Sequence, residues 1–224
     1  MLSTHTLFST NIIEYQNPRA EQLNPEIIKH LKEQQAESPD LPAFSTMGNN
    51  AWHSKDNLAD LDTDWSRGLR QMIIDLSGRY YLALMGGIPL PSEEFLRIKC
   101  WGLVLGQYSY SNFHSHPNSD ISGVYWVQNP DNLPINEGRF SIPDPRGGAH
   151  ASRLEGSQAW YANPKPGNGL MFTSWVPHHV EPHYQEGERI SISWNLFIKD
   201  PPPGTKMLSV ASSSWRDANG DNWG

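Results

Sequence analysis

Apolar and polar residues alternate along the segment RISISWNLFI, residues 189–198. From Ile190 to Asn195 the even positions carry apolar side chains, whereas the odd positions carry serine and asparagine. Neighbouring side chains of a strand point to opposite faces, so this pattern predicts a β-strand with one apolar face. Comparable short runs, separated by Pro- and Gly-rich joins, are FLRIKCWGLVLG, SGVYWVQ, GRFSI, LMFTSWV and HHVEPHY. Together they predict a mainly β core arranged as a sandwich or jelly roll.

The first hundred residues carry a helical pattern instead. Apolar side chains from Leu69 to Tyr80 recur every three or four positions, which predicts a helix that begins at about Thr63. An earlier helix is expected to start with Asn24 as its N-cap and Pro25 in its first turn.

These patterns fit a single domain built in three parts. Residues 1–94 are expected to form a helical and looped N-terminal support, residues 95–200 the jelly-roll core, and residues 201–224 a loosely packed tail. Turn-forming residues fill the segments 44–58 and 142–169, so both segments are expected to be irregular.

Charge and composition narrow the classes of partner. The 224 residues contain 24 acidic and 17 basic side chains, and this formal net charge of −7 argues against binding to a nucleic-acid backbone. The one cysteine, Cys100, excludes an intrachain disulfide and fits a reducing compartment. The chain starts without a basic and apolar leader and has no apolar run of about 20 residues. It is therefore expected to be cytoplasmic and not to cross a membrane.

Two histidines stand one residue apart in the stretch NFHSHP. In an extended segment, residues i and i+2 point to the same side, so His114 and His116 would aim at one point. Imidazole is the commonest protein ligand for transition metals. A third histidine, His178, follows after a separation that leaves room for the intervening strands of a jelly roll. An adjacent strand could return it to the same point.

Arg189 and Ser191 share one face of the alternating strand. A guanidinium offers two parallel charge-assisted hydrogen bonds to a carboxylate, and a hydroxyl can add another. Because Arg189 follows soon after His178, the two residues could hold an organic acid that also chelates the metal.

The order of these motifs resembles that of a known family. H-x-H-P is followed by S-G-V-Y, then by S-W-x-x-H and R-I-S-I-S-x-N, while GNNAWHSKDNL and PDPRG resemble further signatures. From about Met47 to Leu196 the chain is similar to the 2-oxoglutarate/Fe(II)-dependent oxygenases of the double-stranded β-helix superfamily. The resemblance implies a double-stranded β-helix (jelly roll), Fe(II) and 2-oxoglutarate as cofactors, and hydroxylation of a substrate that no motif identifies.

The resemblance also implies the metal ligands. His114 and His178 match the two histidine positions of the family's triad, and His116 stands where most of the superfamily has Asp or Glu. Asp120 is a carboxylate that could substitute for His116, although a turn role with a hydrogen bond to its own backbone is favoured. Three neutral imidazoles would leave the metal with its full charge, which should weaken retention of Fe(II) against Zn(II) or Cu(II).

A site for the co-substrate is implied in the same way. Arg189 would bind the distal carboxylate of 2-oxoglutarate, and Ser191 would assist it. On the strand after the H-x-H motif, one of Tyr125 and Trp126 should face the barrel interior. Tyr125 is the candidate for contact with the co-substrate, whereas Trp126 is expected to pack in the core.

Other histidines and aromatic residues are expected to have structural roles. His179 should point away from the metal because neighbours in a strand alternate, and His183 should lie at the surface in a turn. His53 could approach the site if its loop folds over it, although a structural contact is favoured. Trp175 and Trp194 are expected to pack in the core.

Two other kinds of protein share part of this pattern. Cupin-like barrels also use three histidines, without 2-oxoglutarate, and there Arg189 would bind the substrate's own carboxylate. A non-catalytic β-sandwich would present tryptophans on an exposed face and bind no metal. For the oxygenase, the expected partners are O2 and a small-molecule or peptide substrate, and nothing in the sequence decides for or against a homodimer.

Overall fold

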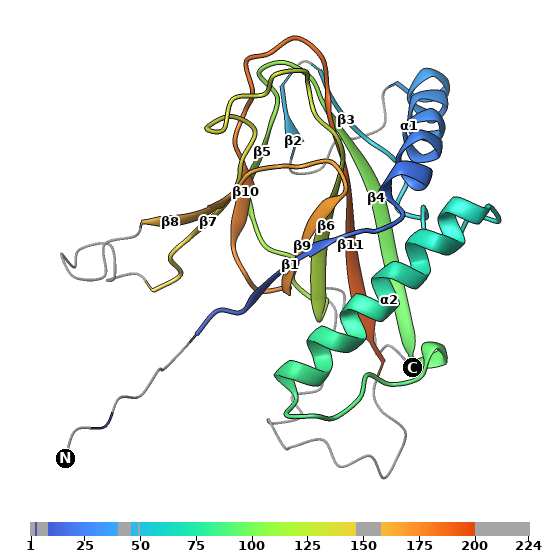
Figure 1. Ribbon diagram of the computed structural model, residues 1–224, viewed down its shortest axis with the longest axis vertical. Coiled ribbons are helices and arrows are strands. Elements are labelled where there is room, and N and C mark those ends of the chain that lie inside the picture. The colour runs from blue at the N-terminus through green and yellow to red at the C-terminus, as the bar shows by residue number, and fades with distance from the viewer. Residues whose placement is uncertain (1–2, 4–8, 40–45, 49, 147–157, 200–224) are drawn as a thin grey trace.

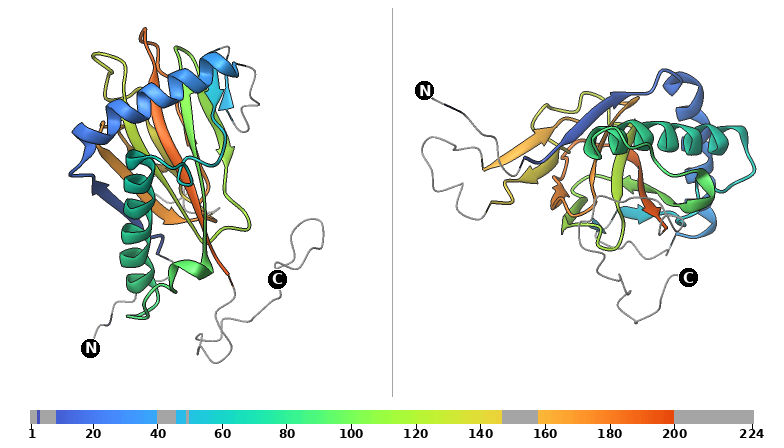
Figure 2. Two further views of the ribbon diagram at one scale, coloured as in Figure 1. Left: turned by 90° about the vertical axis from the view of Figure 1, so that its right-hand side faces the viewer. Right: turned by 90° about the horizontal axis from the view of Figure 1, so that it is seen from below.

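Two β-sheets face each other, and two long helices lie against one of them (Figures 1 and 2). This computed structural model describes residues 3, 9–39, 46–48, 50–146 and 158–199. The expected tail from residue 201 onward lies outside the described residues. Among the described residues, no helix combines the length and the apolar character that a membrane span needs.

The main sheet has six strands in the order β1-β9-β6-β11-β4-β3. In that order they span Ile12–Gln16, Asn168–Thr173, Ile121–Gln128, Arg189–Ile198, Leu96–Leu105 and Ala51–His53. The second sheet has five strands in the order β2-β5-β10-β7-β8. They span Thr46–Met47, Tyr110–His114, His178–Val180, Phe140–Pro143 and Ala159–Ala162.

All of these strand pairs are antiparallel, and from β4 to β11 the chain passes repeatedly from one sheet to the other. This alternation produces the double-stranded β-helix (jelly roll) that the family resemblance implied. The longest pairing, between β11 and β4, runs from Arg189 opposite Leu105 to Ile198 opposite Leu96. It forms the centre of the main sheet and fixes which residues face the barrel interior.

Helices α1 (Ala20–Glu37) and α2 (Asp64–Leu84) cover the outer face of the main sheet, and a 3-10 turn at Glu93–Phe95 leads into β4 (Figure 2). Each helix buries one apolar stripe against the sheet, and the two stripes are Leu23, Ile27 and Leu31, and Trp65, Leu69 and Ile73. The ring of Trp194 on β11 lies where a Cβ of Gly123 would stand on β6. A glycine is therefore required at this close approach.

The prediction of the second helix is confirmed, because Thr63 caps α2 by accepting a hydrogen bond from the Ser66 backbone N–H. The predicted start of the first helix is wrong. Helix α1 begins at Ala20, so Asn24 and Pro25 lie inside its first turns. The Asn24 amide instead donates to the Val127 carbonyl at 2.9 Å, which joins α1 to β6. The side chain of Asn24 therefore makes a tertiary contact and does not cap the helix.

The segments expected to be irregular contain strands. Segment 44–58 contributes β2 and β3, and segment 142–169 contributes β8. The N-terminal part also supplies β1, so it extends the main sheet as well as supporting it. Strands of two to four residues carry no period of their own, and only pairing with a neighbour defines them.

Candidate metal centre

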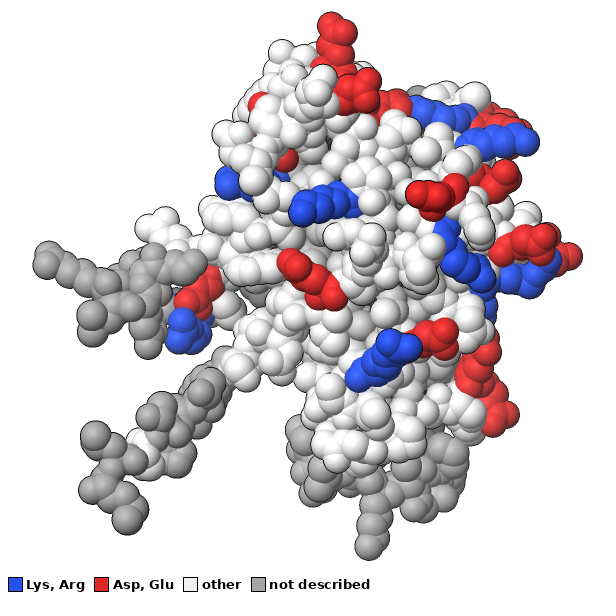
Figure 3. Space-filling view, viewed as in Figure 1, with Lys and Arg blue, Asp and Glu red and all other residues white. Residues whose placement is uncertain are grey.

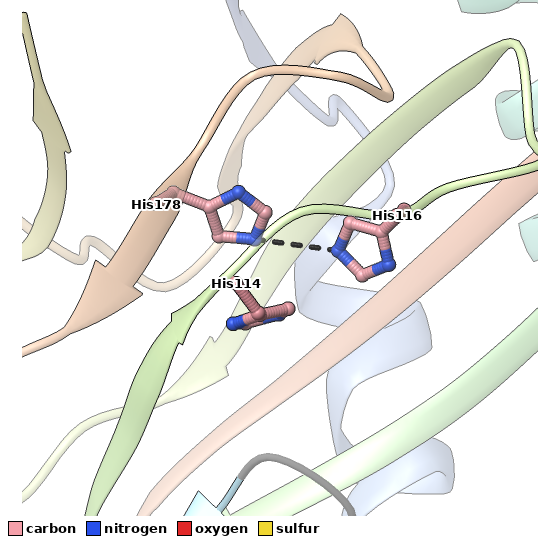
Figure 4. Close-up of side chains that lie close together, drawn as sticks. All are labelled: His114, His116 and His178. Atoms are coloured by element: carbon pink, nitrogen blue, oxygen red, sulfur yellow. Dashed lines mark hydrogen bonds between the residues drawn. The ribbon is translucent and has the colours of Figure 1, made fainter. Parts of the chain in front are cut away.

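Three histidines converge between the two sheets (Figure 4). His114 is the last residue of β5 and lies opposite His178, the first residue of β10. His116 follows two residues after the end of β5, and its Nε2 lies 3.3 Å from Nε2 of His178. One nitrogen from each ring lies within 4.8 Å of the other two. Among the described residues, this is the group of His, Cys, Asp and Glu side chains that could share a metal ion.

Backbone carbonyls orient two of these rings. Nδ1 of His178 donates to the Val176 carbonyl at 2.9 Å, and Nδ1 of His114 donates to the Asn112 carbonyl at 2.6 Å. A hydrogen on Nδ1 leaves the lone pair on Nε2 for a metal, and such outer hydrogen bonds are typical of metal-binding histidines.

Burial keeps all three imidazoles uncharged. Burial and the neighbouring His114 lower the pKa of His116 to about 4. The pKa of His178 is held well below its ordinary value, mainly by burial and then by His114 and His116. Burial also lowers the pKa of His114, against an opposing effect of its hydrogen bond to Asn112. At neutral pH the site therefore presents three neutral nitrogen donors, the form that a metal requires.

Hydroxyl groups hold the segment that carries His116, which lies outside any strand. The Ser119 hydroxyl donates to the His116 carbonyl at 3.0 Å, and the His116 backbone N–H donates to the Ser174 carbonyl at 2.9 Å. The Ser174 hydroxyl donates to the Ser119 carbonyl, which closes the network. These bonds tie the loop after β5 to the loop after β9, the segment that leads to His178.

Asp120 does not join the three histidines. Its Oδ2 accepts a hydrogen bond from the Ile198 backbone N–H at 2.7 Å, at the end of β11. Burial raises the pKa of this carboxyl group. Its partner is thus the neighbouring strand and not the turn of Asp120 itself, and the carboxylate closes the end of the main sheet.

Arg189 and Ser191 lie on the inner face of β11 with unpartnered polar atoms. The Arg189 side chain is 1% exposed, and none of its three nitrogens has a hydrogen-bond partner in the described part of the chain. The Ser191 hydroxyl is buried and equally unpartnered. Burial lowers the pKa of Arg189 to about 10, so the group is still charged at neutral pH. An unpaired buried charge is costly, and the arrangement fits an anionic ligand that supplies the missing acceptors.

Tyr125 and Trp126 occupy opposite faces of β6. Tyr125 packs among the side chains beneath the helices, and its hydroxyl donates to Asn24 Oδ1 at 2.6 Å. Trp126 belongs to the cluster on the inner side, lies opposite Ser191, and has a buried, unpartnered indole N–H. The structure does not bring Tyr125 to the metal or to Arg189. Trp126 is buried in the inner apolar cluster and occupies the inner position that was expected for Tyr125.

The preference for Tyr125 was wrong because β6 is buried on both faces and its sequence does not mark the inner one. From Ile121 to Val127 every residue is buried, so no apolar alternation marks the inner side. Only the register against β11 assigns Trp126 to the interior.

The structure confirms some of the predicted positions of the other histidines and tryptophans and contradicts others. Trp194 is fully buried as expected, but Trp175 is 54% exposed. His183 is completely buried and not at the surface, because its Nε2 donates to the Leu105 carbonyl at 3.0 Å beneath the end of β4. His179 is half-buried on the outer side of β10, beside Phe113.

His53 makes the structural contact that was favoured for it, and this contact also brings it near the metal centre. Its ring stacks on Trp101 with a centroid separation of 5.6 Å and an interplanar angle of 13°. The Trp101 ring in turn lies 5.9 Å from the ring of His116. Strands β3 and β4 thus add an aromatic wall, His53 and Trp101, beside His116.

The family comparison agrees with this site. A family model described as "Putative 2OG-Fe(II) oxygenase" matches residues 99–195. The matched segment contains the three histidines, Arg189 and Ser191. A search among curated proteins finds no match.

Solved structures with the same fold include several oxygenases. A prolyl-4-hydroxylase from Pseudomonas putida is 16% identical, with a TM-score of 0.58 over 85% of this chain and 94% of that one. A prolyl hydroxylase from Trichoplax adhaerens, bound to a hypoxia-inducible-factor peptide, is 13% identical, with a TM-score of 0.57 over 85% and 84%.

HygX from Streptomyces hygroscopicus, solved with nickel and 2-oxoglutarate, is 12% identical, with a TM-score of 0.55 over 84% and 83%. At such identities the likeness concerns the fold, and the family model adds the chemistry. The model that matches residues 99–195 is that of the 2OG-Fe(II) oxygenases, a family whose cofactors are Fe(II) and 2-oxoglutarate.

Proposed function

We propose that this chain is an Fe(II)- and 2-oxoglutarate-dependent hydroxylase in which His114, His116 and His178 hold the metal. The observation that carries the proposal is their convergence to within 4.8 Å of one another, inside a barrel that also buries the unpaired charge of Arg189. Imidazole is a ligand for iron as well as for zinc and copper, and a buried cation suits the far end of a dicarboxylate.

The proposed site for 2-oxoglutarate extends from the histidines to the start of β11. Arg189 would bind the distal carboxylate, and the Ser191 hydroxyl and the Trp126 indole N–H would donate further hydrogen bonds. All three side chains are buried and present unpartnered polar atoms. A single carboxylate would satisfy several of these at once, which offsets the cost of burying them.

In the proposed reaction, O2 supplies one oxygen atom to the substrate and one to the co-substrate. 2-Oxoglutarate loses CO2 and becomes succinate, and a C–H bond of the substrate becomes C–OH. The bound Fe(II) supplies the redox chemistry. The protein's part is to orient the acid through Arg189, to hold His116 through its loop contacts, and to keep water from the buried end of the barrel.

For the wider setting, we propose a cytoplasmic enzyme that acts on a small molecule or a peptide and does not bind nucleic acid. The lone Cys100 is buried and unpaired, as suits a reducing compartment. On the face shown in Figure 3, acidic and basic side chains are interspersed and no continuous basic patch is present. Whether two chains pair is decided by measuring mass in solution.

Metal binding tests the ligand assignment most directly. His178→Ala should lower the affinity for Fe(II) or Mn(II) by at least about tenfold, since one of three ligands is lost. His179→Ala is the matched control, because its side chain lies on the outer side of the same strand. Retention of the metal by both variants would refute the assignment.

Consumption of 2-oxoglutarate tests the reaction class. The Fe(II)-loaded protein should convert 2-oxoglutarate to succinate slowly even without a second substrate, and His178→Ala should not. A three-histidine enzyme of another class would bind the metal yet form no succinate.

A further inference from the structure

The wall formed by Trp101 is not among the residues assigned to the metal or to 2-oxoglutarate in the proposed function. Trp101 is paired with Ser193 and lies nearer the start of β4 than Leu103, which is paired with Ser191. Arg189 is at the opposite end of the same pairing, opposite Leu105. Trp101 therefore borders the metal on the side away from the proposed acid pocket. Its ring is half-buried and lies 5.9 Å from the ring of His116.

His53 holds this indole ring in place. The two rings are stacked nearly parallel, and Nδ1 of His53 donates to the Ser54 carbonyl at 2.6 Å. The imidazole is thus fixed to the backbone and covers part of the indole. A braced aromatic ring is a platform that a ligand can use without the entropic cost of ordering it.

Polar groups continue the same inner face beyond Trp101. Lys99 and Asn195 lie opposite each other, two residues further toward the end of the sheet that Asp120 closes. Lys99 Nζ lies 3.1 Å from Asp56 Oδ2, and both side chains are partly exposed. Asn195 Oδ1 accepts from Ser122 at 2.8 Å, which leaves the amide hydrogens of Asn195 as donors. Hydrogen-bond donors and acceptors therefore lie next to Trp101 along the same face of the sheet.

This combination selects a chemical class of substrate. An aliphatic chain could cover Trp101 but would strip water from Lys99, Asp56 and Asn195 without replacing it. A saturated ring with hydroxyl groups offers C–H bonds to the indole face and hydroxyls to the polar edge. We propose that the substrate hydroxylated at this centre is a polyhydroxylated ring of the pyranoside kind, stacked on Trp101. This inference rests on the proposed function and names the substrate class of the same site.

Binding can be tested without turnover. The protein would be loaded with Zn(II), which supports no oxidation, and saturated with 2-oxoglutarate. Saturation-transfer NMR would then be recorded with methyl glycosides of glucose, galactose, mannose and rhamnose, and with acetyl-prolinamide as a ring of similar size without hydroxyls. We expect transfer to the ring C–H protons of at least one glycoside and little to acetyl-prolinamide.

Two tryptophan variants provide the matched comparison. Trp101→Phe retains an aromatic ring of smaller area and should weaken glycoside binding about threefold to tenfold. Trp175→Phe alters an exposed tryptophan that makes no ring contact with His116 among the described residues, and it should change nothing. His53→Ala should weaken binding as well, since the platform loses its brace.

The outcomes separate this inference from the proposed function. Calorimetric titration of 2-oxoglutarate into the same samples reports on the metal and acid sites alone, and its failure would count against the hydroxylase itself. If 2-oxoglutarate binds but no glycoside does, or if Trp101→Phe and Trp175→Phe bind glycosides equally, the pyranoside inference is overturned. Preferential binding of acetyl-prolinamide would overturn it too.

Discussion

The two faces of β11 contrast sharply although they belong to one strand. On the outer face, Ile190, Ile192 and Trp194 are completely buried against helices and pack as an ordinary apolar core. On the inner face, Arg189 and Ser191 are just as buried but have no hydrogen-bond partner among the described residues. The outer face stabilises the fold, whereas the inner face buries polar atoms whose missing hydrogen bonds a ligand can supply.

A single unpartnered atom does not make this distinction. The indole N–H of Trp194 is also buried and unpartnered, although it lies on the helix side. What marks the inner face is the concentration of such atoms around a buried charge. Three nitrogens of Arg189, the hydroxyl of Ser191 and the indole of Trp126 lie on neighbouring positions of β11 and β6.

The largest expected effect concerns the outer face. Trp194→Ala should lower the free energy of unfolding by about 3–5 kcal/mol, because it removes the largest fully buried side chain and leaves a cavity beside Gly123. Urea unfolding measures this loss. The folded fraction should still bind 2-oxoglutarate with unchanged affinity, and a large loss of affinity would show that the two faces are not independent.

Arg189→Met should weaken the binding of 2-oxoglutarate without lowering the stability of the fold. The dissociation constant for 2-oxoglutarate should rise at least about 30-fold, since a buried charge pair can no longer form. The ligand-free protein should unfold with a free energy that is unchanged or higher by about 1–4 kcal/mol, because an unpaired buried charge is removed. Arg70→Met is the control, as Arg70 on α2 pairs with Asp60 and Glu93 at the surface. Marked destabilisation by Arg189→Met would contradict the contrast between the faces.

The free energy of unfolding of the metal-free protein should depend on pH, because the buried histidines of the inner side are uncharged in the folded chain. The pKa of His116 is about 4 in the folded chain, against an ordinary value of 6.5. Between these values the unfolded chain binds more protons, so the free energy of unfolding should fall as the pH drops from about 6.5 to 4, and level off below. His116 alone accounts for about 3 kcal/mol. Unfolding curves at several pH values measure the slope, which should flatten in His116→Gln. If His116→Gln shows the same slope, the pH dependence of the free energy of unfolding comes from groups other than His116.

A pair of conservative changes probes the smallest expected effect. Trp126→Phe and Trp194→Phe each remove one buried indole N–H, from the inner and the outer side respectively. We expect Trp126→Phe to raise the dissociation constant for 2-oxoglutarate about fivefold, the equivalent of one hydrogen bond, and Trp194→Phe to leave it unchanged. Calorimetric titration at fixed metal concentration distinguishes them. An effect of equal size in both would remove Trp126 from the proposed acid pocket.

Much of this architecture could be predicted from the sequence alone. Period-two alternation predicted β11, spacing by three and four predicted α2, and the order of the histidine, serine and arginine motifs indicated the family. These signals are local, since each depends on side-chain direction within one element. The short strands β2, β3 and β8 escaped prediction because pairing, and not composition, defines them.

Tertiary structure alone decided which residues meet. The pairing of β5 with β10 sets His114 opposite His178, and the register of β6 against β11 turns Trp126 inward and Tyr125 toward the helices. His183 became a core residue and Trp175 an exposed one for the same reason. A chain sequence specifies the chemistry of each side chain, but a one-residue change of register would exchange every face, so the composition of the centre is a property of strand pairing.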